Sequence, residues 1–175
     1  MKGRKFALIG FMGSGKSSIG RVLASRLAFP FMDMDEEIER ESALSISELF
    51  EREGEASFRK REEDLLSGLA RPYGDLVLSC GGGIVMSPAN RKLLATAFIG
   101  VWIDVPFAEL MRRLASERAA RPLLASGDHK KKAEELLRLR RPLYEEAARF
   151  TYRWKEGEST SDSAGAIADI LGEYC

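Results

Sequence analysis

The chain has 175 residues, and 27 lysines and arginines balance 27 aspartates and glutamates. This length fits a single domain, residues 1–175, with its own hydrophobic core. The zero net charge provides no basic field for nucleic acid or an anionic membrane, so we expect small-molecule partners and a monomer. No apolar run reaches the roughly 20 residues of a membrane-spanning helix, and the start does not read as a signal peptide. We therefore expect a cytoplasmic protein, or an organellar one after loss of a transit peptide.

Apolar segments alternate with helical patterns along the chain, which predicts a parallel β-sheet covered by helices. A capping box at Ser45 and Glu48 predicts a short helix, and a second helix is expected at about 55–69. A late helix is expected at about 130–148, with a kink or break just before Pro142. The two cysteines, Cys80 and Cys175, are far apart and are expected to be reduced thiols. The predicted strands are residues 5–9, 30–34, 76–80, 98–104 and 150–154.

Residues 10–17 read GFMGSGKS and match the phosphate-binding motif GxxxxGK[ST] between a predicted strand and a predicted helix. The glycines allow backbone amides to approach phosphate oxygens, and the helix N-terminus adds partial positive charge. Lys16 would contact the β- and γ-phosphates, and Ser17 would coordinate Mg²⁺. The sequence thus predicts an ATP-dependent kinase. Its nucleotide-binding candidates are Gly13, Ser14, Gly15, Lys16, Ser17 and Ser18.

Two carboxylates, Asp33 and Asp35, follow the second predicted strand at the sheet edge where ligands bind in open α/β folds. Strand alternation would place both on one face, with Asp33 on the Mg²⁺ side and Asp35 on the acceptor hydroxyl. The equal alternative is that Asp35 and its acidic neighbours only favour the N-terminus of the next helix. Asp104 is a competing Mg²⁺ candidate, although the following Val105-Pro106 favours a structural role at a helix start.

Several arginines and a second glycine loop complete the candidates. Arg59 borders the apolar seam of the helix at 55–69, where it needs an anionic partner. Gly81, Gly82 and Gly83 follow a predicted strand, so a ligand or backbone must approach closely there, unless they form a plain turn. Arginines after the fourth strand, Arg121 among them, predict a lid at about 112–128 that supplies an arginine to the transferred phosphate.

Over essentially its whole length the sequence resembles the shikimate kinase family. The resemblance rests on the strings GFMGSGKSSIGR, FMDMD, SISELFEREGEASFRKRE, GGG, RPLL and RRPLYEEAA, which occur in the family's order. It implies a three-layer α/β/α fold with a five-stranded parallel sheet in the order 2-3-1-4-5, a substrate-binding arm at about 33–61 and the lid. It also implies ATP, Mg²⁺ and transfer of a phosphoryl group to the 3-hydroxyl of shikimate, on the route to chorismate and aromatic amino acids.

The resemblance also implies residue roles. Arg59 and Arg140 would bind the shikimate carboxylate, Asp35 would contact its hydroxyls and act in catalysis, and Gly81, Gly82 and Gly83 would lie beside it. Asp33 with Ser17 would serve the metal, and Arg112 or Arg113 would lie by the adenine. The expected catalytic residues are Lys16, Asp35 and Arg121, the last of which also contacts the ATP phosphates.

The sequence departs from the family at Ala43, where a glycine often precedes the SI helix, and at Cys80, where threonine is usual. Residues 155–162 contain no arginine where relatives often contact adenine, so the resemblance assigns no adenine-binding residue there. A kinase for another polyol acid, such as gluconate, and a catalytically silent nucleotide-binding relative are the two alternatives to the shikimate kinase.

Overall fold

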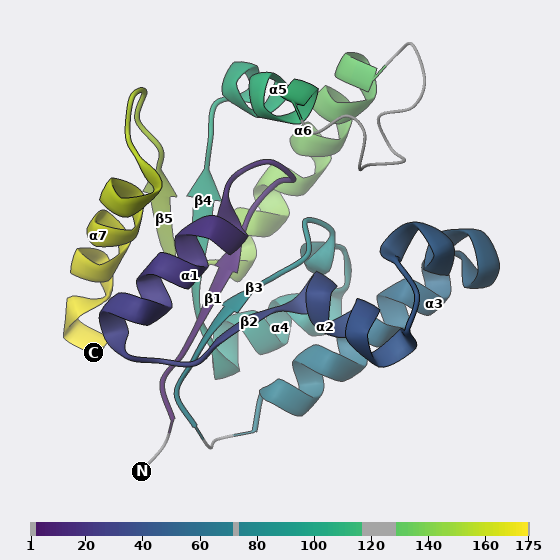
Figure 1. Ribbon diagram of the computed structural model, residues 1–175, viewed down its shortest axis with the longest axis horizontal. Coiled ribbons are helices and arrows are strands. Elements are labelled where there is room, and N and C mark those ends of the chain that lie inside the picture. The colour runs from purple at the N-terminus through teal and green to yellow at the C-terminus, as the bar shows by residue number, and fades with distance from the viewer. Residues whose placement is uncertain (1–2, 72–73, 117–128, 175) are drawn as a thin grey trace.

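The computed structural model describes residues 3–71, 74–116 and 129–174, and its centre is a five-stranded sheet in the order β2-β3-β1-β4-β5 (Figure 1). Every strand pair is parallel, as expected. The strands are β1 (Lys5–Ile9), β2 (Phe31–Asp33), β3 (Leu76–Ser79), β4 (Ile99–Asp104) and β5 (Phe150–Arg153). The predicted sheet order is therefore confirmed, and each observed strand lies within its predicted segment.

Alternation along the central strand separates two cores, because successive side chains point to opposite faces. Phe6 and Leu8 of β1 face α1 (Lys16–Leu27) and α7 (Thr160–Leu171). Ala7 and Ile9 face the opposite layer, formed by parts of α3 (Ile46–Leu69), α4 (Pro88–Ala97) and α6 (His129–Ala147). Both faces of the sheet are covered, which is the three-layer arrangement that the alternating sequence pattern predicts.

The helices α2 (Met34–Ser42) and α3 project from the β2 edge of the sheet, away from α7 (Figure 1). A small separate core of Ile38, Leu49 and Phe58 joins them. The predicted capping box begins α3, with Ser45 and Glu48 bonded reciprocally. The two predicted helices form one element interrupted at Gly54, whose φ of 80° and ψ of 168° are non-helical. Only glycine adopts this conformation without strain, so the interruption of the helix lies at the glycine.

A kink or break was predicted just before Pro142, and the break is absent. Helix α6 continues through this proline to Ala147 as one element. Hydrogen bonding resumes on the far side, where the amide of Ala148 bonds to the carbonyl of Tyr144 at 2.9 Å. Proline removes one backbone donor, and the packing of the following turn against the sheet maintains the helix. Within the described residues no helix is both long and apolar enough to cross a membrane.

Candidate active site

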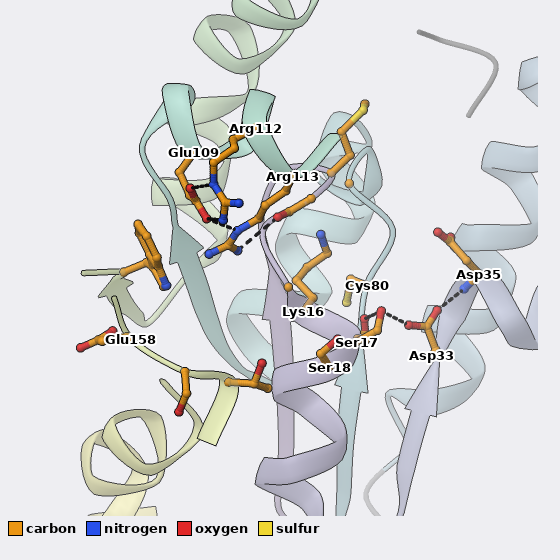
Figure 2. A pocket seen from close by; sticks show the side chains of 18 of the residues that line it. Lys16, Ser17, Ser18, Asp33, Asp35, Cys80, Glu109, Arg112, Arg113 and Glu158 are labelled. Atoms are coloured by element: carbon orange, nitrogen blue, oxygen red, sulfur yellow. Dashed lines mark hydrogen bonds and ion pairs between the residues drawn. The ribbon is translucent and has the colours of Figure 1, made fainter. Parts of the chain in front are cut away.

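A pocket of about 950 Å³ opens at the carboxyl ends of the strands, where ligands bind in open α/β folds. Its walls come from four parts of the chain: the loop before α1, the end of β2 with the start of α2, the end of β3 with the loop after it, and the segments that follow β4 and β5 (Figure 2). Most of the predicted nucleotide and metal residues line it. Those residues are Gly13, Gly15, Lys16, Ser17, Ser18 and Asp33, and Asp35 and Gly82, predicted for the acceptor, line the pocket as well.

The loop between β1 and α1 has the conformation that a phosphate-binding loop requires. Gly13 and Gly15 have φ values of 78° and 89°, in the region that favours glycine, and Gly15 directly precedes the first turn of α1. Lys16 lies beneath the loop with its Nζ donating to the carbonyls of Gly10 and Phe11, each at 2.9 Å. The N-terminus of α1, with its partial positive charge, and the ammonium of Lys16 therefore lie at the same loop. The side chain of Ser14 is buried and does not line the pocket.

Oxygen ligands gather around Ser17. Its hydroxyl donates to Asp33 Oδ2 at 2.5 Å and lies 3.2 Å from the hydroxyl of Ser79 at the end of β3. Asp33 also caps α2, since its Oδ1 accepts from the amides of Asp35 and Glu36. Hydroxyl and carboxylate oxygens in this arrangement are the donors that a hard cation such as Mg²⁺ prefers. The residues predicted for the metal thus fit it, and Ser79 adds an oxygen that the sequence did not suggest.

The expectation that strand alternation places Asp33 and Asp35 on one face was wrong. Strand β2 ends at Asp33, and Asp35 belongs to the first turn of α2 together with Glu36 and Glu37. Acidic side chains are favourable there because of the helix dipole, so the structural role that the sequence left open is present. Asp35 nevertheless lines the pocket. The two interpretations of Asp35 are therefore compatible.

The arginine and the glycines predicted for the acceptor lie against each other. A side chain at Gly83 would collide with the guanidinium of Arg59. A Cβ at Gly81 would come within 2.5 Å of Glu62 Oε1 and 3.0 Å of Asp35 Oδ1. The glycine loop thus lies against two acidic groups and an arginine, and a side chain at Gly81 or Gly83 would displace the ends of Glu62 or Arg59. This close approach favours a position beside the site over a plain turn.

Glu62 is a buried site residue that sequence reasoning missed. Its side chain is 1% exposed and its Oε2 accepts from Arg59 Nη1 at 2.5 Å, whereas its Oε1 has no partner within the described part of the chain. Burial raises the pKa of Glu62, and the charge and hydrogen bond of Arg59 oppose that rise. Its position three residues after Arg59, on the same apolar seam, was the available signal.

Gly82 connects the two halves of the site. Its carbonyl accepts from Arg140 Nη1 at 3.3 Å and from the hydroxyl of Tyr144 at 2.5 Å. A Cβ at Gly82 would lie 3.3 Å from the amide nitrogen of Met12 in the phosphate loop. Arg140 is only 6% exposed and is not among the residues that line the pocket. The bond to Gly82 nevertheless brings Arg140 to the same loop as Arg59.

The opposite wall is built from α5 (Phe107–Ser116) and the segment after β5 (Figure 2). Glu109 binds both Arg112 and Arg113, each at 2.7 Å, and hydrogen bonds from Arg112 and then Arg113 lower the pKa of Glu109 to about 2. Arg113 also donates to the carbonyl of Gly13 at 3.3 Å and stacks over Trp154 at 4.8 Å. Both arginines proposed for the adenine line this wall. Trp154 was not among the residues predicted for the site.

Three further predictions concern Cys80, Asp104 and the lid. Cys80 is buried beside the pocket, and burial raises the pKa of its thiol, so the residue is an uncharged thiol. Asp104 binds Arg141 at 2.6 Å and does not line the pocket, which supports its structural role. Of the predicted lid, residues 112–116 belong to α5 and residues 117–128, with Arg121, lie outside the described residues.

Comparison with known proteins identifies relatives over nearly the whole chain. The family model described as shikimate kinase matches residues 12–171. A shikimate kinase from Thioalkalivibrio sulfidiphilus is 46% identical over 167 residues, which cover 95% of this chain and 84% of the relative. The solved structure of a shikimate kinase from Acinetobacter baumannii in complex with shikimate has a TM-score of 0.91 and 35% identity. That match covers 98% of this chain and 94% of the other.

A gluconokinase from Sinorhizobium meliloti also shares the fold, with a TM-score of 0.57, 98% coverage of this chain and 97% of its own. Its identity of 17% shows common architecture alone, so the gluconate alternative is not favoured. The match to the family model over residues 12–171 and the relatives at above 40% identity give the assignment. The chain belongs to the shikimate kinase family and is a phosphotransferase.

Proposed function

We propose that this chain transfers the γ-phosphoryl group of ATP to the 3-hydroxyl of shikimate, yielding shikimate 3-phosphate and ADP, a step on the route to chorismate and aromatic amino acids. One observation carries the proposal. An anion-binding pair, Arg59 and Arg140, lies beside a glycine loop that directly contacts the phosphate loop. Such a site can hold a carboxylate-bearing acceptor next to the donor phosphates.

On the donor side the work is positioning and charge neutralisation, because the transferring phosphoryl group passes through a loose transition state. Gly13, Gly15 and Ser18 would surround the phosphates, and Lys16 would move from the loop carbonyls to the β- and γ-phosphate oxygens. Its present hydrogen bonds to Gly10 and Phe11 support this role, because they hold the ammonium within reach of the loop.

Ser17 and Asp33 would hold Mg²⁺, Ser17 through its hydroxyl and Asp33 through the water shell. Their mutual bond of 2.5 Å supports a shared role. When bound, the ion would neutralise phosphate charge. Asp33 also fixes the start of α2 and thereby the position of Asp35.

On the acceptor side, Arg59 and Arg140 would form paired hydrogen bonds with the substrate carboxylate. Asp35 would accept a hydrogen bond from the attacking hydroxyl and orient it towards the γ-phosphorus. The glycines 81–83 would allow the ring of the acceptor to lie against backbone. Glu62 supports this arrangement by holding Arg59 in place from the buried side.

The region after α5 completes the proposal. Residues of the predicted lid, with Arg121, would close over the bound substrates, stabilise the transferred phosphate and exclude water that would otherwise hydrolyse ATP. We also propose that the enzyme acts as a cytoplasmic monomer on small molecules, without a nucleic-acid or membrane partner. The balanced charge of the chain supports this.

The test is ADP release from MgATP, measured with shikimate, with gluconate, with a nucleoside monophosphate and with no acceptor. We expect strong stimulation by shikimate alone, with shikimate 3-phosphate identified by mass spectrometry. Stimulation by gluconate would keep the kinase but replace the acceptor. ATP binding without turnover of any acceptor would instead favour the catalytically silent relative.

A further inference from the structure

Tyr144 lies beneath the acceptor half of the site and has no role in the mechanism described above. It is fully buried in α6, and its ring stacks on Trp102 of β4 with centroids 5.9 Å apart. Its one polar atom donates to the carbonyl of Gly82 at 2.5 Å. Tyr144 therefore links Trp102 in the core to Gly82, the middle residue of the glycine loop.

The same carbonyl is shared with Arg140, and the two bonds are unequal. Arg140 Nη1 lies 3.3 Å from the Gly82 oxygen, at the long end of the hydrogen-bond range, whereas the tyrosine bond is short. The Nε of Arg140 is buried and has no partner within the described residues, although the whole residue is only 6% exposed. Tyr144 thus satisfies the loop carbonyl, and its hydroxyl also accepts a hydrogen bond from the side chain of Arg140.

We propose that Tyr144 is a positioning residue of the acceptor site: its hydroxyl fixes the Gly82 carbonyl, and so leaves the guanidinium of Arg140 available to a substrate carboxylate. This inference rests on the proposed function, which assigns Arg140 to that carboxylate. Without the hydroxyl, Gly82 would have Arg140 as its remaining side-chain donor. The arginine would then be drawn towards the carbonyl and away from the ligand, because a buried carbonyl left without its donor is costly.

The position of Gly82 explains why the effect would reach the acceptor and not the nucleotide. Residues 81 and 83 contact Asp35, Glu62 and Arg59, which all belong to the acceptor half. Lys16 and Ser17 have their own hydrogen bonds within the donor half. A shift of the Gly82 carbonyl would therefore alter the acceptor contacts first.

Tyr144→Phe tests this, since the phenyl ring keeps the packing against Trp102 and only the hydroxyl is lost. The matched control is Tyr152→Phe, which removes the same atom from another buried tyrosine, bonded to Glu158 and Ser163. We expect Tyr144→Phe to raise both the KM and the calorimetric Kd for shikimate about fivefold or more, with the KM for ATP changed less than about twofold. Tyr152→Phe should leave the Kd for shikimate unchanged.

Arg140→Lys provides a second test in the same site. If the tyrosine acts through the guanidinium, the two changes together should weaken shikimate binding less than the product of their separate effects. Fully multiplicative effects would argue against the proposal. An unchanged shikimate Kd in Tyr144→Phe, with Tm lowered as much as in Tyr152→Phe, would reduce Tyr144 to a packing residue and overturn it. Equal losses for shikimate and ATP would overturn the assignment to the acceptor half.

The wild-type enzyme separates this inference from the proposed function. If wild-type protein binds and phosphorylates shikimate while Tyr144→Phe is unaffected, only the role of Tyr144 fails. If wild-type protein does not bind shikimate in the calorimeter, the proposed function fails, and the inference fails with it.

Discussion

The guanidinium of Arg59 lies 2.5 Å from the carboxylate of Glu62, whose side chain is almost entirely buried. A second bond, to the exposed carboxylate of Glu55 at 3.0 Å, holds the other edge of the same guanidinium. Arg59 is therefore oriented before any ligand arrives. Preorganisation of this kind reduces the entropy lost on binding, and it makes the geometry of the arginine as important as its charge.

Arg59→Lys should accordingly weaken shikimate binding far more than ATP binding. Lysine keeps the charge opposite Glu62 but cannot form two parallel bonds to a carboxylate. We expect the KM for shikimate to rise about tenfold or more, with Tm little changed. Arg61→Lys is the control, because Arg61 pairs with Glu53 at 3.0 Å away from the glycine loop. Similar increases in both KM values would contradict the assignment of Arg59.

Asp33→Asn should separate the metal role of this residue from its helix-capping role. Asparagine still caps a helix, so the start of α2 should remain intact, while the negative charge beside Ser17 is lost. We expect the Mg²⁺ concentration for half-maximal activity to rise and kcat to fall about tenfold or more. Asp33→Ala should in addition lower stability by about 1 kcal/mol through loss of the cap. An unchanged Mg²⁺ requirement in Asp33→Asn would remove Asp33 from the metal site.

Gly20→Ala should destabilise the protein, although alanine favours helices by about 1 kcal/mol. A Cβ at Gly20 would lie 2.6 Å from the ring of Phe31 and 3.2 Å from Leu8, so α1 would have to move away from the sheet. Overpacking of this kind typically costs about 1 to 3 kcal/mol, which exceeds the gain in helix propensity. Gly68→Ala is the control, because that exposed helical site has open space and should gain about 0.5 to 1 kcal/mol. Urea unfolding of both variants measures the contrast.

Glu109→Gln should change the pH dependence of stability. The folded-state pKa of Glu109, about 2, lies below its ordinary value of 4.5, so the carboxylate stabilises the fold above pH 4.5 and loses that contribution as the pH falls towards 2. We expect the variant to be less stable than wild type near neutral pH and the difference to shrink between pH 4.5 and 2. The free energy of unfolding in urea, measured at several pH values, tests this. A difference that stays constant with pH would show that the carboxylate does not stabilise the fold through its charge.

The periodicity of the sequence predicted the strands and their helical cover, and one specific motif predicted the phosphate loop, because these depend on local patterns; the order of the strands was implied by the family resemblance. Periodicity failed at Asp35, since FMDMD has the alternation of a strand while the acids that follow favour the start of a helix. The resemblance supplied the pairing of Arg59 with Arg140.

Contacts between distant segments were beyond the sequence patterns. A glutamate is expected to be exposed to solvent. Glu62 is buried because it pairs with Arg59 and lies against the loop at 81–83. Trp154 enters the pocket wall because α5 brings Arg113 over its ring. The spacing of Glu62 from Arg59 was the one sequence signal for the first relationship, and no periodic pattern indicates the second.

The contact of Gly82 with the phosphate loop also constrains how such an enzyme can evolve. The amide of Met12 would lie 3.3 Å from any Cβ added at Gly82, and the Gly82 carbonyl holds two side chains of the acceptor half. The backbone of Gly82 therefore lies between the acceptor half and the phosphate loop. A side chain added at this residue would press on the phosphate loop, in contrast to a change that only shifts its carbonyl. New acceptor specificities are therefore more accessible through α2 and α3, whose small core of Ile38, Leu49 and Phe58 is separate from the main ones.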